Sequence, residues 1–286
     1  MTNQGIQLKA PAKVNVFLEV TGKRPDGYHN IFSIFIPVEL YDNLEIRKGN
    51  TGLIRFKSKG FNVPEDPTNL VYRAASSFFK KTGIKNSGVN IKLEKNIPVA
   101  AGLGGGSSDA ASTLLALNEL YKFPLKKTDL HEIALSLGAD VPFFLDAVPS
   151  IVTGIGEILE PIPNWPEFWY LIITPKLEIS TAWVYRNYKM ELTSNEYDYI
   201  RKTLKNGDII ISGILKNDLE KVTSTSFPII NTLKRKLMDA GAEGAIMSGS
   251  GPSVFGIFLS RAKAVSARDL LMSDNLRHIS VVKGKG

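Results

Sequence analysis

The 286-residue sequence contains no cysteine. This absence excludes disulfide bonds, thiol nucleophiles and metal sites with cysteine ligands. The sequence also lacks any run of about 18 uninterrupted apolar residues, the length that a membrane-spanning helix needs. Its first residues, MTNQGIQLKA, have no apolar segment behind a basic start, as a secretory signal would. We therefore expect a cytoplasmic protein with no membrane partner.

Positive charge is in moderate excess, because 35 Lys and Arg residues stand against 28 Asp and Glu residues and give a net charge of +7. Such an excess favours an anionic partner, either a small molecule or a nucleic acid. A nucleic-acid binder would gather basic and aromatic residues on one face, but the basic residues here are spread along the chain. We expect an anionic small-molecule ligand and no nucleic acid, and nucleic-acid binding stays an alternative.

Strand-like patterns come in runs rather than in strict alternation with helical ones, which is typical of an α+β fold. Strands are expected at 7–20, 31–40, 43–48, 53–57, 89–93, 169–175, 244–247, 253–258 and 279–282. Helices are expected at 69–82, 109–121 and 128–138, through most of 181–237 and most clearly at 228–238, and at 261–272. Thr128 is the expected N-cap of its helix. The proline-rich segment 161–168 is a candidate linker, which predicts two domains, residues 1–161 and 162–286.

The segment PVAAGLGGGSSDAAST, residues 98–113, places glycines directly before an expected helix. The N-terminus of a helix attracts anions, and glycine lets phosphate oxygens approach the backbone. The segment lacks the lysine of a Walker A loop, and Ser107 stands where the dinucleotide-binding fingerprint needs its third glycine. The pattern therefore predicts a phosphate loop of neither common type, and a tight packing turn is the alternative.

This loop resembles the phosphate loop of the GHMP kinases, and four further blocks resemble the same superfamily. These blocks are APAKVNVFL at 10–18, GKRPDGYH at 22–29, GADVPFF at 138–144 and MSGSGPSVFG at 247–256. The GLGGGSSDAA and DGYH forms are most similar to the branch that phosphorylates the 2-hydroxyl of an alcohol carrying cytidine diphosphate, in the non-mevalonate isoprenoid pathway. The resemblance implies a two-domain fold, with an N-terminal domain like ribosomal protein S5 domain 2 and a ferredoxin-like C-terminal domain.

The resemblance also implies ATP as phosphate donor, with Mg²⁺ near Ser107 or Ser108 and no dedicated metal-ligating side chain. The residues implied for ATP binding are Asn69, Leu70, Lys95, Pro98, Gly102, Leu103, Gly104, Gly105, Gly106, Ser107, Ser108 and Asp109. A supporting glycine loop, expected to pack beside the phosphate loop, consists of Ser248, Gly249, Ser250 and Gly251.

For catalysis, the resemblance implies Asp140 as general base and Lys13 as its cationic partner. The residues implied for binding the cytidine diphosphate substrate are Asn15, Tyr28, His29 and Tyr185, with Trp183 as a rival of Tyr185 for stacking on cytosine. Read alone, these residues would be given ordinary roles: solvated positions on a strand, a surface histidine and a turn aspartate. Apart from nucleic-acid binding, two alternatives remain, a homoserine or mevalonate type of GHMP kinase and a non-catalytic ligand-binding protein of the same fold.

Overall fold

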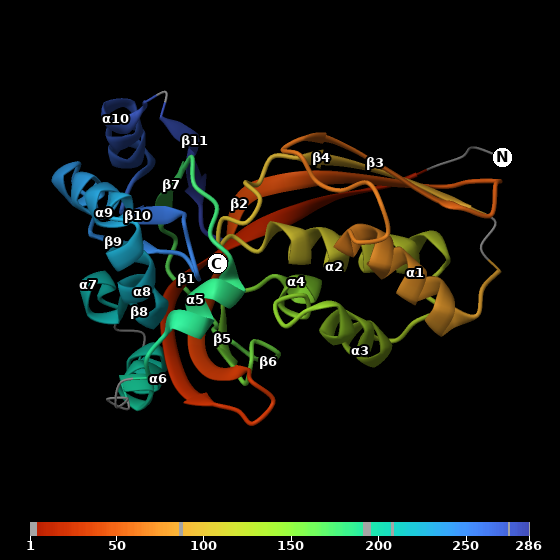
Figure 1. Cartoon of the computed structure of the whole chain (residues 1–286), viewed down its shortest axis with the longest axis horizontal. Helices are drawn as coiled ribbons and strands as arrows, with labels where there is room; N and C mark the ends of the chain where they lie inside the picture. The colour runs from red at the N-terminus through yellow and green to blue at the C-terminus, as the bar shows by residue number, and fades with distance from the viewer. Residues whose placement is uncertain (1–4, 86–87, 191–195, 207–208, 274, 286) are drawn as a thin grey trace. The chain divides into compact units, whose positions relative to one another are not determined.

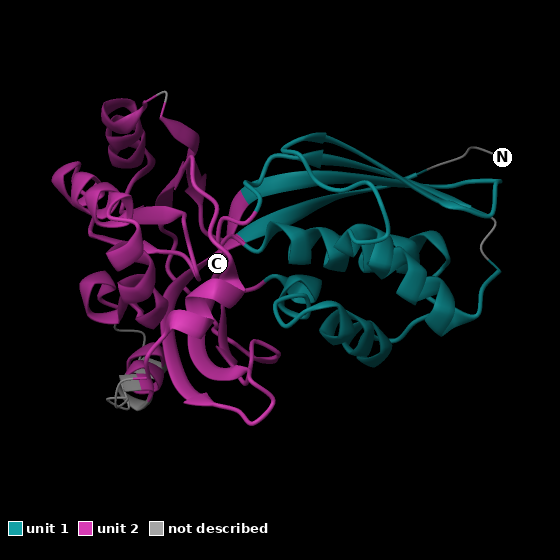
Figure 2. Cartoon of the chain, in the orientation of Figure 1, with its two compact units in different colours: residues 1–12, 40–99, 104–147 teal, residues 13–39, 100–103, 148–286 magenta. Residues whose placement is uncertain are grey.

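The structure is a computed structural model that describes residues 5–85, 88–190, 196–206, 209–273 and 275–285. Its chain forms two compact units, coloured separately in Figure 2. Unit 1 consists of Met1–Ala12, Leu40–Val99 and Gly104–Ala147, and unit 2 of Lys13–Glu39, Ala100–Leu103 and Val148–Gly286. The first two strands, β1 (Ile6–Lys23) and β2 (His29–Lys48), each contribute residues to both units.

Unit 1 combines strands with a layer of helices on one of their sides (Figure 1). The second half of β2 pairs antiparallel with β4, from Asn43 opposite Glu94 to Lys48 opposite Val89, and β4 pairs in parallel with β3. The remaining elements of unit 1 are β3 (Ile54–Gly60), α1 (Leu70–Thr82), β4 (Val89–Lys95), α2 (Gly105–Leu120), α3 (Lys127–Leu137) and α4 (Phe143–Asp146).

Local sequence explains these elements. In β4 the odd positions Val89, Ile91 and Leu93 are buried and the residues between them are more exposed, which is the period of a half-buried strand. In α1 the buried side chains recur at helical spacing: Val71, Ala74, Ala75, Phe78 and Phe79. The side chain of Asn69 caps the start of α1, and Gly83 ends it in the left-handed conformation, with φ of 65°.

Unit 2 contains a four-stranded antiparallel sheet in the order β11-β7-β10-β9. Its hydrophobic cluster joins the sheet residues Ile173, Val254 and Phe258 to Leu233 and Leu237 of helix α9. The first half of β2 pairs with β5, β5 pairs with β6, and β1 pairs in parallel with β8. The remaining elements of unit 2 are β5 (Ser150–Thr153), β6 (Ile158–Pro161), β7 (Trp169–Pro175), α5 (Thr181–Asn187), α6 (Glu196–Asn206), α7 (Ile211–Ile214), β8 (Lys216–Asn217), α8 (Asp218–Ser226), α9 (Ile229–Asp239), β9 (Gly244–Met247), β10 (Val254–Phe258), α10 (Arg261–Leu271) and β11 (Leu276–Lys283).

The expected α+β class is confirmed, and the differences from the expected elements are local. The strands expected at 31–40 and 43–48 are one continuous strand, β2, because Tyr41 and Asp42 stay extended between them. The cap of α3 is not Thr128: the helix begins at Lys127, and the Asp129 carboxylate accepts a 3.0 Å hydrogen bond from the backbone N–H of Lys126. The short helix α4 was not expected.

The most consequential difference concerns α2, which begins at Gly105 rather than at residue 109. Glycine is a poor helix former, so the sequence pattern predicts a loop at residues 104–108. In the structure Gly105, Gly106, Ser107 and Ser108 form the first turn of the helix, after Gly104 in the left-handed conformation, with φ of 70°. The backbone N–H groups of a first turn have no partner within their own helix. The glycines therefore belong to the anion-binding end of α2 itself.

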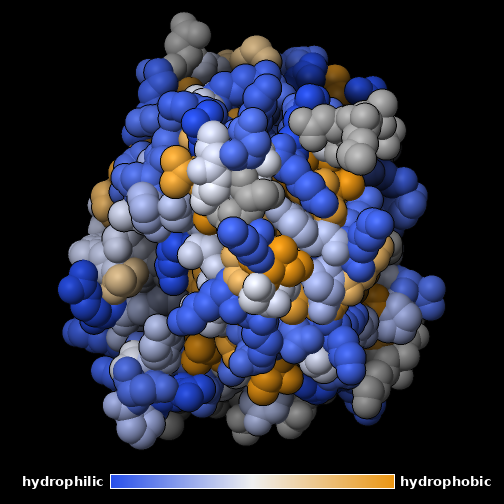
Figure 3. Space-filling model, turned by 90° about the vertical axis from the view of Figure 1, so that its right-hand side faces the viewer, coloured by the Kyte–Doolittle hydropathy of each residue, from blue (hydrophilic) through white to orange (hydrophobic). Residues whose placement is uncertain are grey.

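The surface is polar where it can be seen. The face drawn in Figure 3 is mostly hydrophilic, with hydrophobic side chains in scattered patches. Among the described residues, no helix has both the length and the apolar character that a membrane crossing requires.

Candidate active site

The loop from β4 to α2 has a backbone that changes direction sharply. Ala100, Gly102 and Gly104 adopt positive φ angles of 52°, 76° and 70°. Gly102 can have no side chain here, because a Cβ would overlap the carbonyl oxygen of Ser248. Pro98 and Leu103 are buried, and Gly106 at the helix start is exposed. The loop thus leaves bare backbone next to the first turn of α2.

Two buried oxygen atoms of that turn have no hydrogen-bond partner among the described residues. They are the Ser108 hydroxyl and Oδ1 of Asp109, and both side chains are almost completely buried. A buried polar atom without a partner is costly and calls for an explanation. Hydroxyl and carboxylate oxygens are the ligand type that Mg²⁺ takes. This end of α2 therefore fits a phosphate group with its cation, which suits the position predicted for Ser107, Ser108 and Asp109.

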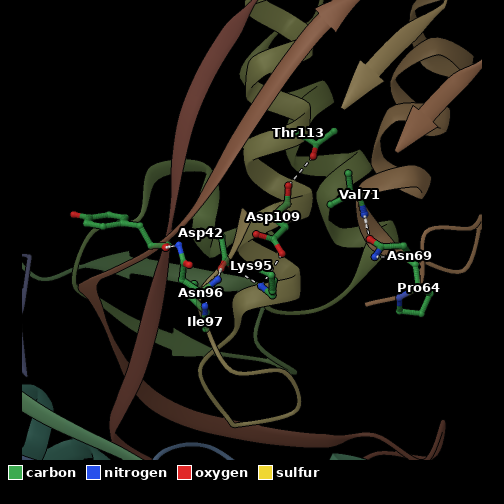
Figure 4. A network of polar contacts seen from close by, with 10 residues as sticks. Asp42, Pro64, Asn69, Val71, Lys95, Asn96, Ile97, Asp109 and Thr113 are labelled. Carbon is green, nitrogen blue, oxygen red and sulfur yellow. Dashed lines mark hydrogen bonds and ion pairs between the residues drawn. The ribbon is translucent and has the colours of Figure 1, made fainter. Parts of the chain in front are cut away.

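Lys95 lies below this turn, in a buried ion cluster (Figure 4). Its ammonium group contacts Oδ2 of Asp109 at 2.7 Å and also pairs with Oδ2 of Asp42. Oδ1 of Asp42 accepts hydrogen bonds from the backbone N–H groups of Asn96 (2.6 Å) and Ile97 (2.8 Å). Lys95 is 3% exposed, so its ammonium group binds protein carboxylates. Its predicted contact with ATP stays a prediction.

The charges in this cluster shift one another's pKa. Burial opposes the charge of Lys95, but the negative charges of Asp109 and Asp42 outweigh it and raise the lysine's pKa. Burial also raises the pKa of Asp109, to about 8, and the negative charge of Asp42 adds to the rise while Lys95 opposes it. Two carboxyl groups thus compete for one ammonium group at a buried site.

Asn69 and Leu70 lie at the beginning of α1, near the start of α2. The Asn69 side chain accepts from the N–H of Val71 at 2.9 Å and donates to the carbonyl of Pro64 at 2.8 Å, as Figure 4 shows. A Cβ on Gly106 would come within 3.8 Å of the Leu70 side chain. The structure thus brings Leu70 next to the phosphate loop, where the resemblance placed a nucleotide contact.

Lys13 and Asn15 lie on one face of β1 and are both buried in unit 2. The ammonium group of Lys13 donates to Oδ1 of Asn15 at 2.5 Å and lies 4.4 Å from the centre of the Phe35 ring. The Nδ2 group of Asn15 donates to the Ser33 hydroxyl at 3.1 Å. The predicted general base, Asp140, is half-buried between α3 and α4 in unit 1. The pairing of Lys13 with Asp140 stays a prediction.

The glycine turn between β9 and β10, residues 248–251, packs beside Gly102. The Ser248 hydroxyl donates to the carbonyl of Gly102 at 2.9 Å, and the backbone N–H of Asn15 donates to the same hydroxyl at 3.3 Å. The Ser250 hydroxyl contacts the Thr181 hydroxyl at 2.8 Å. The turn therefore meets the phosphate loop and the strand that carries Lys13.

Asn217 was not among the predicted site residues, although it holds this turn in place. Its Nδ2 group donates to the carbonyls of Met247 and Gly249, both at 2.8 Å, and its Oδ1 accepts from the N–H of Leu219. The segment NDLE, residues 217–220, resembles a recurring segment of the family, so a signal for Asn217 was present in the sequence.

The predicted substrate residues His29 and Tyr185 meet in unit 2. Their rings are stacked, with centres 5.3 Å apart and planes at 26°, and the Tyr188 ring meets His29 edge-on at 6.4 Å. Trp183 instead packs against Phe227, with ring centres 5.9 Å apart. Of the two rivals, Tyr185 is the one beside the histidine.

Tyr28 is the most accessible of the predicted substrate residues, at 59% exposure. Its ring is thus available to a flat ligand. Burial lowers the pKa of the neighbouring His29, and the positive charge of Lys23 lowers it further. His29 therefore favours the neutral form at pH 7, in which one ring nitrogen donates and the other accepts. Such a ring suits the polar edge of a nucleobase.

Within the part of the chain that the structure describes, no three His, Asp or Glu side chains are grouped as a metal site. A cation at α2 would therefore be bound mainly through a nucleotide's phosphates, as Mg²⁺ commonly is.

Comparison with known proteins agrees with this geometry. The family pattern of the GHMP kinases N terminal domain matches residues 69–147, and that of the GHMP kinases C terminal domain matches residues 200–273. A protein of Geotalea daltonii named 4-diphosphocytidyl-2-C-methyl-D-erythritol kinase is 44% identical over 97% of this chain and 98% of its own length. A protein of Alkaliphilus metalliredigens with the same name is 42% identical over 93% of this chain and 92% of its own length.

Solved structures extend the similarity to the fold. A crystal structure of 4-(cytidine 5'-diphospho)-2C-methyl-D-erythritol kinase superposes with a TM-score of 0.82 at 34% identity, covering 98% of this chain and all of that one. Homoserine kinase from Cytophaga hutchinsonii superposes with a TM-score of 0.78 at 20% identity, covering 100% of this chain and 96% of that one, and shares the fold. The chain belongs to the GHMP kinase family, among the 4-diphosphocytidyl-2-C-methyl-D-erythritol kinases.

Proposed function

We propose that this protein transfers the γ-phosphoryl group of ATP to the 2-hydroxyl of 4-diphosphocytidyl-2-C-methyl-D-erythritol, as one step of the non-mevalonate isoprenoid pathway. The observation that carries this proposal is the 44% identity to a protein of that name over 97% of the chain. The phosphate loop that opens α2 supports it, because it presents backbone N–H groups to an anion at a helix start.

Phosphoryl transfer depends mainly on positioning and on neutralising charge. In this proposal, the ATP phosphates bind the backbone from Gly102 to Asp109. Mg²⁺ would be held by those phosphates and by Ser108 Oγ or Asp109 Oδ1, the buried oxygens that lack a partner among the described residues. When bound, the ion supplies positive charge to the phosphate oxygens. Asn69 and Leu70 lie at the beginning of α1, on the side where we place the adenosine.

Asp140 is the proposed general base, which accepts the proton of the attacking hydroxyl. Lys13 is its proposed partner. An ammonium group favours the ionised form of a nearby carboxylate and offsets charge on the transferring group. Asn15 orients that ammonium group, because its Oδ1 accepts from Lys13 at 2.5 Å.

Recognition of the cytidine is assigned to Tyr28, His29 and Tyr185. The exposed ring of Tyr28 and the half-buried ring of Tyr185 offer flat apolar faces for a base. The neutral imidazole of His29, stacked on Tyr185, offers hydrogen bonds to the base edge. The net charge of +7 attracts both substrates, which are anionic.

Three further expectations remain proposals. The sequence domains are residues 1–161 and 162–286, with the phosphate loop and catalytic residues in the first. The partners are small molecules rather than nucleic acids or membranes, and the location is the cytoplasm.

Release of ADP from Mg-ATP tests the proposal. The purified protein is given 4-diphosphocytidyl-2-C-methyl-D-erythritol, homoserine or mevalonate in parallel. We expect turnover with the cytidyl substrate alone. Turnover with homoserine or mevalonate would place the protein in another branch of the family. ATP binding without turnover on any of them would favour a non-catalytic ligand-binding role.

A further inference from the structure

Asp42 belongs to none of the segments that resemble the family, yet it is an acidic residue that is fully buried. It lies in β2, one residue before Asn43, where the pairing of β2 with β4 begins. At the end of β4, the chain leaves the sheet through Lys95, Asn96 and Ile97 and enters the phosphate loop. Asp42 therefore lies beside the point where the chain leaves β4 and continues into the phosphate loop.

The Asp42 carboxylate binds this exit segment with both oxygens. Oδ1 accepts from the backbone N–H groups of Asn96 at 2.6 Å and Ile97 at 2.8 Å, and Oδ2 pairs with the Lys95 ammonium group. The neighbouring carbonyl of Tyr41 accepts a further hydrogen bond from the Asn96 side chain at 3.0 Å. The direction in which the chain leaves β4 is thus fixed by one side chain on the adjacent strand.

The same network reaches the first turn of α2. Lys95 contacts Asp109 at 2.7 Å, and a Cβ on Gly105, the first residue of the helix, would come within 2.8 Å of the Lys95 nitrogen. The Lys95 ammonium group therefore occupies the space next to Gly105, where a side chain would otherwise lie. Figure 4 shows the chain of contacts from Asp42 through Lys95 to Asp109.

We infer that Asp42 is a positioning residue for ATP, which acts through Lys95 and the turn at residues 96–97 to orient the first turn of α2. This inference rests on the proposed function, because it concerns the same nucleotide site. Phosphate binding at a helix start depends on where several backbone N–H groups point. When a mutation displaces the groups of a reactive site by about 1 Å, the reaction rate can fall on the order of a hundredfold. A displaced phosphate loop should lower ATP affinity for the same geometric reason.

A purely electrostatic role for Asp42 and a positioning role predict opposite changes in ATP affinity when the carboxylate is replaced by an amide. The Asp42–Lys95–Asp109 cluster holds two carboxyl groups and one ammonium group, so a fully ionised cluster carries an excess negative charge next to the phosphate loop. If charge alone mattered, the change Asp42→Asn would make ATP bind more tightly. If position matters, the same change weakens binding, because its amide group would face the Lys95 ammonium group donor to donor.

The test measures the Kd of Mg-ATP by calorimetry in wild type and Asp42→Asn, together with the KM for the alcohol. The asparagine can still accept from the N–H groups of residues 96 and 97, so the variant isolates the contact to Lys95. The control is Glu19→Gln, which removes a fully buried carboxylate paired with Lys216 at 3.0 Å in unit 2. Both variants remove the charge of a fully buried carboxylate that is paired with a lysine, which costs stability.

We expect the Kd of Mg-ATP to rise at least about tenfold in Asp42→Asn, in line with the cost of misplacing a binding group, while the KM for the alcohol stays as in wild type. We expect Glu19→Gln to bind ATP like wild type. Unchanged or tighter ATP binding in a folded Asp42→Asn protein would overturn the inference. Because ATP binding is measured without the alcohol, the Kd values test the inference even if the protein does not phosphorylate the proposed alcohol.

Amide hydrogen exchange on the wild type covers the case in which Asp42→Asn does not fold. If Asp42 links the turn to the helix, ATP should slow exchange at Asn96 and Ile97 together with the first turn of α2. Protection that is confined to α2 and leaves both turn amides unchanged would contradict the link.

Discussion

The Ser248 hydroxyl donates a 2.9 Å hydrogen bond to the carbonyl of Gly102, and the carbonyl oxygen of Ser248 occupies the space that a Cβ at residue 102 would need. Two loops that are far apart in the sequence are thus in backbone contact. The contact requires glycine at position 102 for two reasons, the missing side chain and the positive φ of 76°.

Gly102→Ala should therefore lower the free energy of unfolding and the ATP affinity by more than backbone strain alone would. An alanine with positive φ costs about 1–2 kcal/mol, and the overlap with Ser248 adds to this. Gly83→Ala is the matched control, because Gly83 also has a positive φ, of 65°, but nothing lies within 4 Å of its Cβ position. Denaturant unfolding and ATP affinity should both suffer more in Gly102→Ala. Equal losses in the two variants would show that the contact with Ser248 is unimportant.

The pKa of Asp109 predicts how stability depends on pH. Burial raises this pKa from 3.8 to about 8, so between these values the folded protein binds the proton more tightly than the unfolded chain. The contribution to stability is therefore present at low pH and is lost as pH rises toward 8, by up to about 1.4 kcal/mol per pH unit.

Asp109→Asn removes this titration, so its stability relative to wild type should improve as pH rises from 4 to 8. Chemical denaturation across that range measures the difference. Asp239→Asn, at the exposed end of α9, controls for a general effect of removing a carboxylate. A stability difference that is independent of pH would mean that Asp109 is ionised throughout.

The histidine at the proposed cytidine site should titrate below its ordinary pKa of 6.5, because of burial and the charge of Lys23. Lys23→Gln removes that charge, so it should raise the midpoint of His29 in an NMR titration. His278, whose pKa is lowered by burial alone, should keep its midpoint and serves as the internal control. If the His29 midpoint does not move, Lys23 does not influence it.

Asn217 should be intolerant of a negative charge. Its Nδ2 group donates to two backbone carbonyls in the glycine turn, so Asn217→Asp would place acceptors against acceptors in a buried site. We expect the free energy of unfolding, measured by chemical denaturation, to fall by about 1–3 kcal/mol or more, which is the cost of unsatisfied buried polar groups. Asn187→Asp is the control, since the exposed Asn187 donates to one carbonyl only in the described contacts. Similar losses in both would argue against a special role of Asn217.

Much of the fold was predictable because the local patterns are strong. The strand expected at 89–93 and the helix expected at 69–82 are both present, as β4 and α1. The sequence pattern places the start of α2 too late because helix propensity disfavours glycine, whereas a Cβ on Gly105 would overlap the Lys95 nitrogen and the Ile97 side chain. Local rules fail here at the proposed phosphate site, and such conflicts are expected at functional sites.

For the candidate site, the sequence motifs predict only residues that lie within the segments resembling the family. Resemblance named His29 and Tyr185 as substrate residues, and the structure places their rings in a stack. It left Tyr185 and Trp183 as rivals, because sequence alone does not show that Trp183 packs on Phe227. Asp42 had no signal, since a single aspartate between two expected strands gives no hint of its partners. Its role follows from its contact with Lys95, which lies 53 positions away in the sequence and in turn contacts Asp109.

The most direct test of the account is ADP formation from Mg-ATP and 4-diphosphocytidyl-2-C-methyl-D-erythritol by wild type, Asp140→Asn and Asp146→Asn. Asp146 is the control because it lies nearby, at the end of α4, in an exposed ion pair with Lys127. We predict that wild type and Asp146→Asn turn over, whereas Asp140→Asn loses about 10²–10⁴-fold in rate, as is typical when a general base is removed. Wild-type inactivity on this substrate, or full activity of Asp140→Asn, would contradict the account.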